Sequence, residues 1–104
     1  MKVIWQSKAK EGRRLVAAYI YRQFGVNSVK IFRLKVDQMV RMLMQSPNLG
    51  AIDPLFADRP ACYRSVIING LSKMVYRIDG DTIHIVGFWD TRREPQGQAE
   101  LTAS

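Results

Sequence analysis

The residues best suited to chemistry in this sequence are cations, and one group of them follows the last apolar run. Residues 84–96 read "HIVGFWDTRREPQ", so Arg92 and Arg93 stand side by side just after a tryptophan. Paired arginines suit phosphate or carboxylate binding, because each guanidinium is a planar fork of donors that matches two oxygens. The segment therefore predicts either a cationic site or a solvated strand end.

Other catalytic chemistries lack the residues they need. The chain has one histidine and one cysteine, too few for a metal site, so neither metal nor cofactor is expected. Cys62 and His84 form a formal nucleophile–base pair, but no group in the sequence orients the histidine. What remains is phosphate binding, or RNA cleavage in which cations stabilise charge and His84 is the natural acid or base.

The charge balance points to an acidic partner. The 104 residues include 16 Lys and Arg against nine Asp and Glu, a formal net charge of +7. On one small domain this favours nucleic acid, an acidic protein or an anionic surface, although a basic protein without such a partner has the same composition. The sequence shows neither a signal peptide nor an apolar run of the ~18–20 residues that span a membrane. A cytoplasmic domain is expected, with no membrane partner.

Two helices and then three strands are predicted after a short opening strand at Lys2–Trp5. Helical periodicity runs from about Lys8 to Phe24, where Gly25 is placed to end the helix in a positive-φ conformation. A second helix is expected from Asn27 or Ser28, as its cap, to the region of Pro47, and 48–61 should be a loop without regular structure. Asn-Gly at 69–70 and Asp-Gly at 79–80 favour tight hairpin turns between the three strands.

Alternation along the strands divides their side chains between two faces. The set expected under the helices is mostly apolar: Tyr63, Ser65, Ile67, Met74, Tyr76, Ile78, Ile83, Ile85, Gly87 and Trp89. The other set mixes cations, the histidine and apolar residues: Arg64, Val66, Ile68, Lys73, Val75, Arg77, Thr82, His84, Val86 and Phe88. Such a mixture fits a surface covered by a partner that is both apolar and acidic, or a charged outer face with incidental β-branched residues.

In this order and at this length, the segments resemble the RelE/ParE superfamily of toxins from type II toxin–antitoxin modules. The resemblance covers residues 1–95 and rests on "KVIW", "AKEGRRLVAAYIYRQFG", the second helix ending in "SPNLG", "CYRSVIINGLSKMVYRIDGDTIHIVGFWD" and "RREP". It implies one α+β domain of order β-α-α-β-β-β, in which a helical hairpin packs on a four-stranded, mainly antiparallel sheet. Residues 96–104 are expected to be a flexible tail.

The resemblance implies one of two activities. ParE-like members poison DNA gyrase, whereas RelE-like members cleave mRNA on the ribosome, using basic strand residues, an arginine after the last strand and an aromatic or histidine residue near the C-terminus. The tail "EPQGQAELTAS" has no Tyr or His. A strand end with tryptophan followed by "RREP" is also similar to the ParE-like branch of plasmid stabilisation proteins. The ParE-like activity is favoured, and the RelE-like nuclease is the alternative.

The implied partner is an acidic antitoxin that folds on the toxin and forms a hetero-oligomer with it. The residues expected to bind the target, gyrase or the ribosome with its mRNA, are Arg64, Lys73, Arg77, Trp89, Arg92 and Arg93. Those expected to bind the antitoxin are Val66, Val75, Val86 and Phe88. The catalytic candidates of the nuclease alternative are Arg64, Lys73, His84, Arg92 and Arg93. A further alternative is a basic nucleic-acid-binding domain that has no antitoxin.

Overall fold

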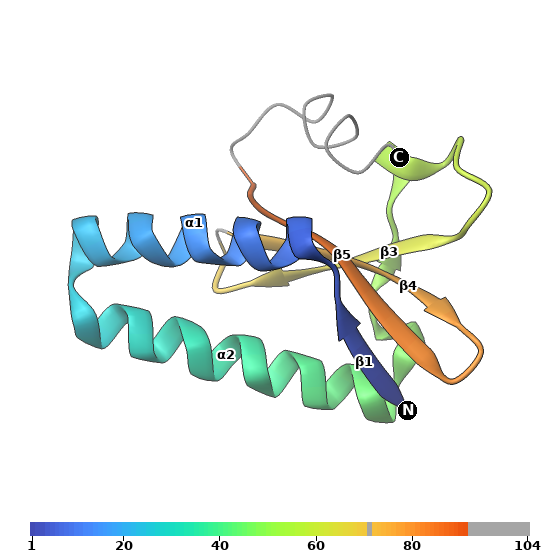
Figure 1. Cartoon of the computed structure of the whole chain (residues 1–104), viewed down its shortest axis with the longest axis horizontal. Helices are drawn as coiled ribbons and strands as arrows, with labels where there is room; N and C mark the ends of the chain where they lie inside the picture. Colours follow the sequence, from blue (N-terminus) through green and yellow to red (C-terminus); the bar gives the residue numbers. More distant parts are fainter. Residues whose placement is uncertain (71, 92–104) are drawn as a thin grey trace.

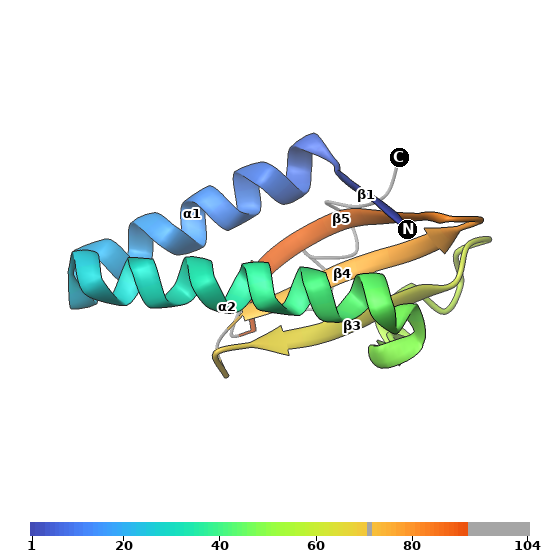
Figure 2. The same ribbon diagram turned by 90° about the horizontal axis from the view of Figure 1, so that it is seen from below.

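A helical hairpin covers one face of a sheet in the computed structural model, which describes residues 1–70 and 72–91 (Figures 1 and 2). The two helices are α1 (Ser7–Phe24) and α2 (Val26–Gln45). Gly25 joins them alone, with a φ of 90°, so the predicted positive φ is confirmed. The predicted cap at Asn27 or Ser28 is wrong, since α2 begins at Val26 and has no side-chain cap. Neither helix is long and apolar enough to cross a membrane.

The sheet has five strands in the order β1-β5-β4-β3-β2. They are β1 (Lys2–Trp5), β2 (Ala51–Ile52), β3 (Tyr63–Ile68), β4 (Ser72–Asp79) and β5 (Thr82–Asp90). Strand β1 is parallel to β5, and the other neighbours are antiparallel. The α+β class and element order are confirmed, and the predicted four strands become five because β2 adds a two-residue edge.

Residues 48–61 are more regular than the expected loop. Besides β2, this part of the chain contains the 3₁₀ helices η1 (Pro47–Leu49) and η2 (Pro54–Phe56). Local interactions explain η2: Pro54 occupies its first position, and the Asp53 carboxylate accepts a hydrogen bond from the Leu55 N–H at 3.0 Å. Short helices held by one cap and one proline have no periodicity long enough to be seen in the sequence.

A β-bulge in β5 explains why the predicted faces were partly wrong. Val75 pairs with Gly87 and Tyr76 with Ile85, which leaves Val86 as the extra residue. An extra residue exchanges the faces of everything that follows it. Phe88 therefore lies under the helices, 1% exposed and edge-on to Phe32 with ring centroids 5.7 Å apart.

The other correction concerns β3, whose two faces were assigned the wrong way round. Val66 pairs directly with Met74, so the two side chains share the face beneath the helices. Ile68 lies in the same core and is 2% exposed, whereas Ile67 faces outwards and is 52% exposed. Each strand has a clear alternation, but the sequence alone does not give the register that relates one strand to the next.

The face of the sheet away from the helices is partly covered as well. Phe56 of η2 packs there against Val75 and Trp89, and the rings of Phe56 and Trp89 are 6.4 Å apart. The segment Asp53–Cys62, which we call the strap, carries Phe56 over this face. Val75 is fully buried and Trp89 is 5% exposed. With Val66 and Phe88 in the main core and Val86 half-buried, the exposed docking face predicted at these valines and Phe88 is not present.

Tyr76 ties the sheet to the end of α2. Its buried hydroxyl donates to the Pro47 carbonyl at 2.6 Å and accepts from the Gly50 N–H at 2.9 Å. Burial raises the pKa of Tyr76, an effect opposed by the hydrogen bond from Gly50 and by the nearby Arg64. The hydroxyl therefore fixes the backbone that follows α2, and only its protonated form can donate.

Replacing Tyr76 with phenylalanine should lower the free energy of unfolding by about 1–3 kcal/mol at neutral pH, because two buried backbone groups lose their partner. Since the pKa of Tyr76 is raised in the folded state, the hydroxyl contributes fully below the ordinary tyrosine pKa of ~10, and the contribution is lost as pH rises through the folded pKa. The stability gap between the two proteins should therefore narrow above pH ~10 in urea titrations. Tyr21→Phe, at an exposed site, is the control; a gap that stays constant to high pH would contradict the assignment.

Candidate functional site

The predicted cationic face is divided by the fold, beginning with Arg64. Its side chain lies on the helix-covered side of β3, opposite Tyr76, and its guanidinium donates to the carbonyls of Gly50 at 2.8 Å and Asn48 at 3.4 Å. These bonds hold the backbone around η1 and β2 against β3. Arg64 thus stabilises the backbone between α2 and β2, and its side chain does not lie on the same face of the sheet as Lys73 or Arg77.

Lys73 lies on the opposite face but is also engaged. Its ammonium is 2.9 Å from the Asp53 carboxylate, and the two side chains are only 14% and 4% exposed. The Phe56 ring lies against the same ammonium, at 5.9 Å from its centroid. Lys73 therefore fastens the strap to the sheet and is not presented to a ligand.

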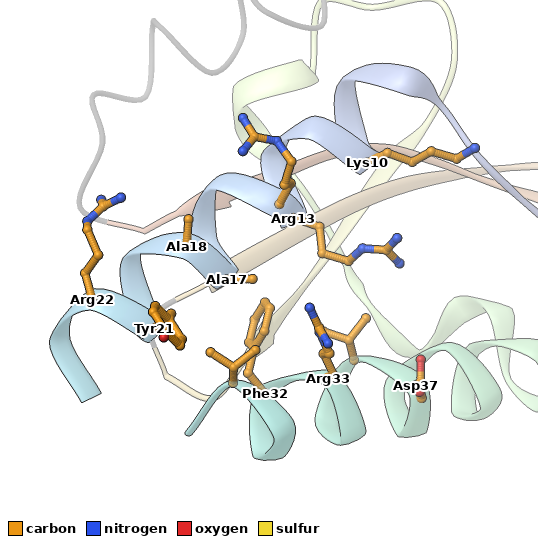
Figure 3. A pocket seen from close by; sticks show the side chains of 12 residues that line it. Lys10, Arg13, Ala17, Ala18, Tyr21, Arg22, Phe32, Arg33 and Asp37 are labelled. Atoms are coloured by element: carbon orange, nitrogen blue, oxygen red, sulfur yellow. The ribbon is translucent and has the colours of Figure 1, made fainter. Parts of the chain in front are cut away.

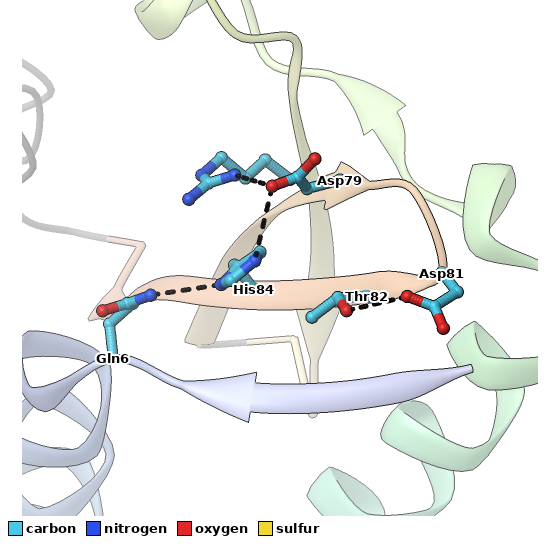
Figure 4. A network of polar contacts seen from close by, with 6 residues as sticks. Gln6, Asp79, Asp81, Thr82 and His84 are labelled. Carbon is cyan, nitrogen blue, oxygen red and sulfur yellow. Dashed lines mark hydrogen bonds and ion pairs between the residues drawn. The ribbon is translucent and has the colours of Figure 1, made fainter.

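His84 is the centre of a small polar network on the same face (Figure 4). Its Nδ1 is 3.3 Å from the Gln6 amide nitrogen, and its Nε2 is 4.0 Å from the Asp79 carboxylate. Arg77 lies 3.8 Å from that carboxylate and is paired with His84 across β4 and β5. The structure thus brings Arg77 and His84 together but places neither Arg64 nor a free Lys73 beside them.

Two further predictions concern the end of β5. Trp89, predicted to bind the target, is buried against Phe56 and is not exposed for contact. Arg92 and Arg93 lie outside the described residues, as does the tail at 96–104. Within the described ranges 1–70 and 72–91, no group of three or more His, Cys, Asp or Glu side chains is placed to hold a metal ion.

The basic surface is on the helices. Nine Lys and Arg against two Asp and Glu fall within Ser7–Gln45, whereas seven of each fall in the rest of the chain. The helical hairpin therefore carries the entire formal net charge of +7. This concentration of charge can be counted from the sequence once the helix boundaries are known.

A groove of about 760 Å³ runs between α1 and α2 (Figure 3). The two helices meet at Gly25 and diverge towards β1 (Figure 2). Apolar side chains of both helices line the groove: Ala17, Ala18, Val29, Phe32 and Val36. Charged and aromatic side chains also line it: Lys10, Arg13, Arg14, Tyr21, Arg22, Arg33 and Asp37. The groove thus combines an apolar lining with five cations and one carboxylate.

The groove cations differ in how far they are already engaged. Arg14 forms a bidentate pair with Glu11, whose pKa is lowered chiefly by the hydrogen bond from Arg14. Arg13 stacks over the Trp5 ring at 4.3 Å from its centroid. Arg22 and Arg33 are exposed on opposite helices and have no ion-pair partner among the described residues. Lys10 is likewise exposed and has no ion pair among the described residues, so Lys10, Arg22 and Arg33 are the groove cations most available to a partner.

These features define a class: a small α+β domain whose helical hairpin carries the net positive charge and a partly apolar groove. The same fold occurs in a chain of the structure described as "Chromosomal ParDE TA system from P. aeruginosa". The two chains superpose with a TM-score of 0.69 and 20% sequence identity, over 86% of this chain and 95% of the other. The RelE/ParE-like fold is therefore confirmed. No protein-family model and no curated protein matches the sequence.

Proposed function

We propose that this protein is a ParE-like toxin of a type II toxin–antitoxin module, that it acts in the cytoplasm by poisoning DNA gyrase, and that an acidic antitoxin neutralises it. The observation that carries the proposal is the fold shared with a chain of a ParDE system over nearly the full length of that chain. Fold alone does not define an activity, so the chemistry of the surface has to support it.

The interhelical groove supports the antitoxin half of the proposal. An amphipathic helix laid into it would place apolar side chains on Ala17, Ala18 and Tyr21, which keep exposed surface above the buried floor of the groove. Its carboxylates would lie near the exposed arginines Arg22 and Arg33. Opposite charge steers association and fixes orientation, while burial of apolar surface supplies affinity. The groove therefore replaces the outer face of the sheet as the proposed antitoxin surface.

The basic residues of the strands are already bound to other groups of the fold, and this favours gyrase over mRNA as the target. RNA cleavage needs cations free to stabilise developing charge, yet Arg64 binds backbone carbonyls and Lys73 is paired with Asp53. Among the described residues, the strand positions that the nuclease alternative requires are thus engaged within the fold. Arg77, Arg92 and Arg93 remain proposed target contacts.

Purified protein should inhibit DNA supercoiling by gyrase and accumulate cleaved DNA, while ribosome-bound mRNA stays intact. A supercoiling assay and primer extension on programmed ribosomes measure the two outcomes. Codon-specific mRNA cuts without gyrase inhibition would overturn the proposal in favour of the nuclease, with His84 as the first residue to test. Salt-dependent nucleic-acid binding without either activity would instead indicate a basic nucleic-acid-binding domain.

A further inference from the structure

The connection between the two helices exposes a compact group of large apolar side chains. We call Tyr21, Phe24, Gly25 and Val26 the hairpin tip. Tyr21 is 61% exposed, Phe24 63% and Val26 54%, and Phe24 is the most exposed large apolar residue in the described chain. Among the described residues, the hairpin extends beyond the strands at this end (Figure 1), and Phe24 borders a cavity that it shares with Ser72 and Asp90. Aromatic side chains presented in this way are typical centres of protein interfaces.

The backbone holds the hairpin tip rigidly. Gly25 takes a φ of 90° and is the single residue between the helices. Its N–H donates to the Tyr21 carbonyl at 3.0 Å, and its own carbonyl accepts from the Val29 N–H at 3.4 Å. The exposed side chains are therefore set at the ends of two regular helices. Preorganised anchors lose little conformational entropy when a partner binds them.

The charge around the hairpin tip defines the chemistry of its partner. Residues 12–36 contain six Lys and Arg and no Asp or Glu, and Arg22 and Lys30 lie within a few residues of Gly25. The complementary surface is an apolar pocket bordered by carboxylates, as an acidic protein offers. A DNA phosphate backbone would match the cations but would leave Phe24 and Val26 without an apolar contact.

We propose that the hairpin tip is the surface that anchors the toxin to its protein target, through insertion of Phe24 and Val26 into an acid-bordered apolar pocket. The inference rests on the proposed toxin function and adds to it a second surface beside the antitoxin groove. Tyr21 belongs to both surfaces, since it lines the groove and flanks Phe24. A segment bound in the groove therefore covers part of the target surface, which couples antitoxin binding to neutralisation.

The test compares the wild type, the double variant Phe24→Ser with Val26→Ser, and a control that makes the same kind of change elsewhere. The control is Leu34→Ser with Ile52→Ser, since both residues are 59% exposed and outside the hairpin tip. Inhibition of gyrase supercoiling by each purified protein is measured beside its melting temperature and its sedimentation. Loss of the two apolar anchors should raise the concentration of the tip variant needed for half-inhibition by about 10- to 100-fold, with the control unchanged.

The outcomes separate the inference from the function on which it rests. Failure of the wild type to inhibit gyrase would remove the proposed function, whereas a tip variant as potent as the wild type would overturn the inference alone. A change in oligomeric state on mutation would also overturn it, because a second copy would then be the occupant of the tip. Loss of salt-dependent DNA affinity in the tip variant would overturn it in favour of nucleic acid. If the double variant is unfolded, the single variants Phe24→Ser and Val26→Ser are compared with the wild type in the same supercoiling assay.

Discussion

Reversing the charge of Arg22 and Arg33 together should weaken antitoxin binding by about 30- to 700-fold, which corresponds to about 2–4 kcal/mol. Both side chains line the groove, one from each helix, and neither is in an ion pair among the described residues. Glutamate at these positions removes two attractions and adds two like-charge contacts with an acidic partner. Since both residues are exposed, the melting temperature should stay close to that of the wild type.

The measurement is calorimetric titration with the product of the neighbouring reading frame, at two salt concentrations. Lys8→Glu with Lys30→Glu is the matched control, because it changes the net charge equally at two exposed lysines outside the groove. An equal loss of affinity in the control would show that total charge matters and that the groove is not the docking site.

Replacing Asp53 with alanine should lower the free energy of unfolding by about 3–5 kcal/mol, because the ammonium of Lys73 is then buried without its partner. The same change removes the cap of η2, so the strap loses its ion pair to β4 and a hydrogen bond within η2. Urea denaturation followed by tryptophan fluorescence suits the measurement, since Trp89 packs on Phe56 of the strap. Asp58→Ala, at an exposed position of the strap, should change stability by less than about 0.5 kcal/mol.

A second substitution shows whether the loss of stability comes from the unpaired ammonium of Lys73. Combining Asp53→Ala with Lys73→Met should recover much of the lost stability, because an apolar side chain can be buried at this site without the cost of an unpaired ammonium. If Asp53→Ala costs little, or if the double variant recovers nothing, the pair does not fasten the strap. Lys73 would then be available as a cation for RNA chemistry, and the nuclease alternative would gain support.

The helices were predictable because their apolar residues recur over many turns and Gly25 ends the first of them. The faces of the strands were not, since the extra residue Val86 has no signature of its own and moves Phe88 and Trp89 to opposite faces from those predicted. The engagement of Lys73 by Asp53 depends on the path of the strap, which short-range patterns do not record. The location of the net charge on the helices, by contrast, can be predicted by counting the charged residues within the helix boundaries.

The parallel pairing of β1 with β5 has a consequence for biosynthesis. Lys2 pairs with Thr82, 80 residues later, and β5 lies between β1 and β4 in the finished sheet. Helices α1 and α2 therefore leave the ribosome well before the strand on which α1 packs, with Phe32 and Val36 lacking the surface that will bury them. Contacts this distant in sequence slow folding, because the chain must close a large loop before it gains their energy. Until β5 has left the ribosome, the sheet that buries Phe32 and Val36 is incomplete, and the proposed antitoxin could reach the helical hairpin in that interval.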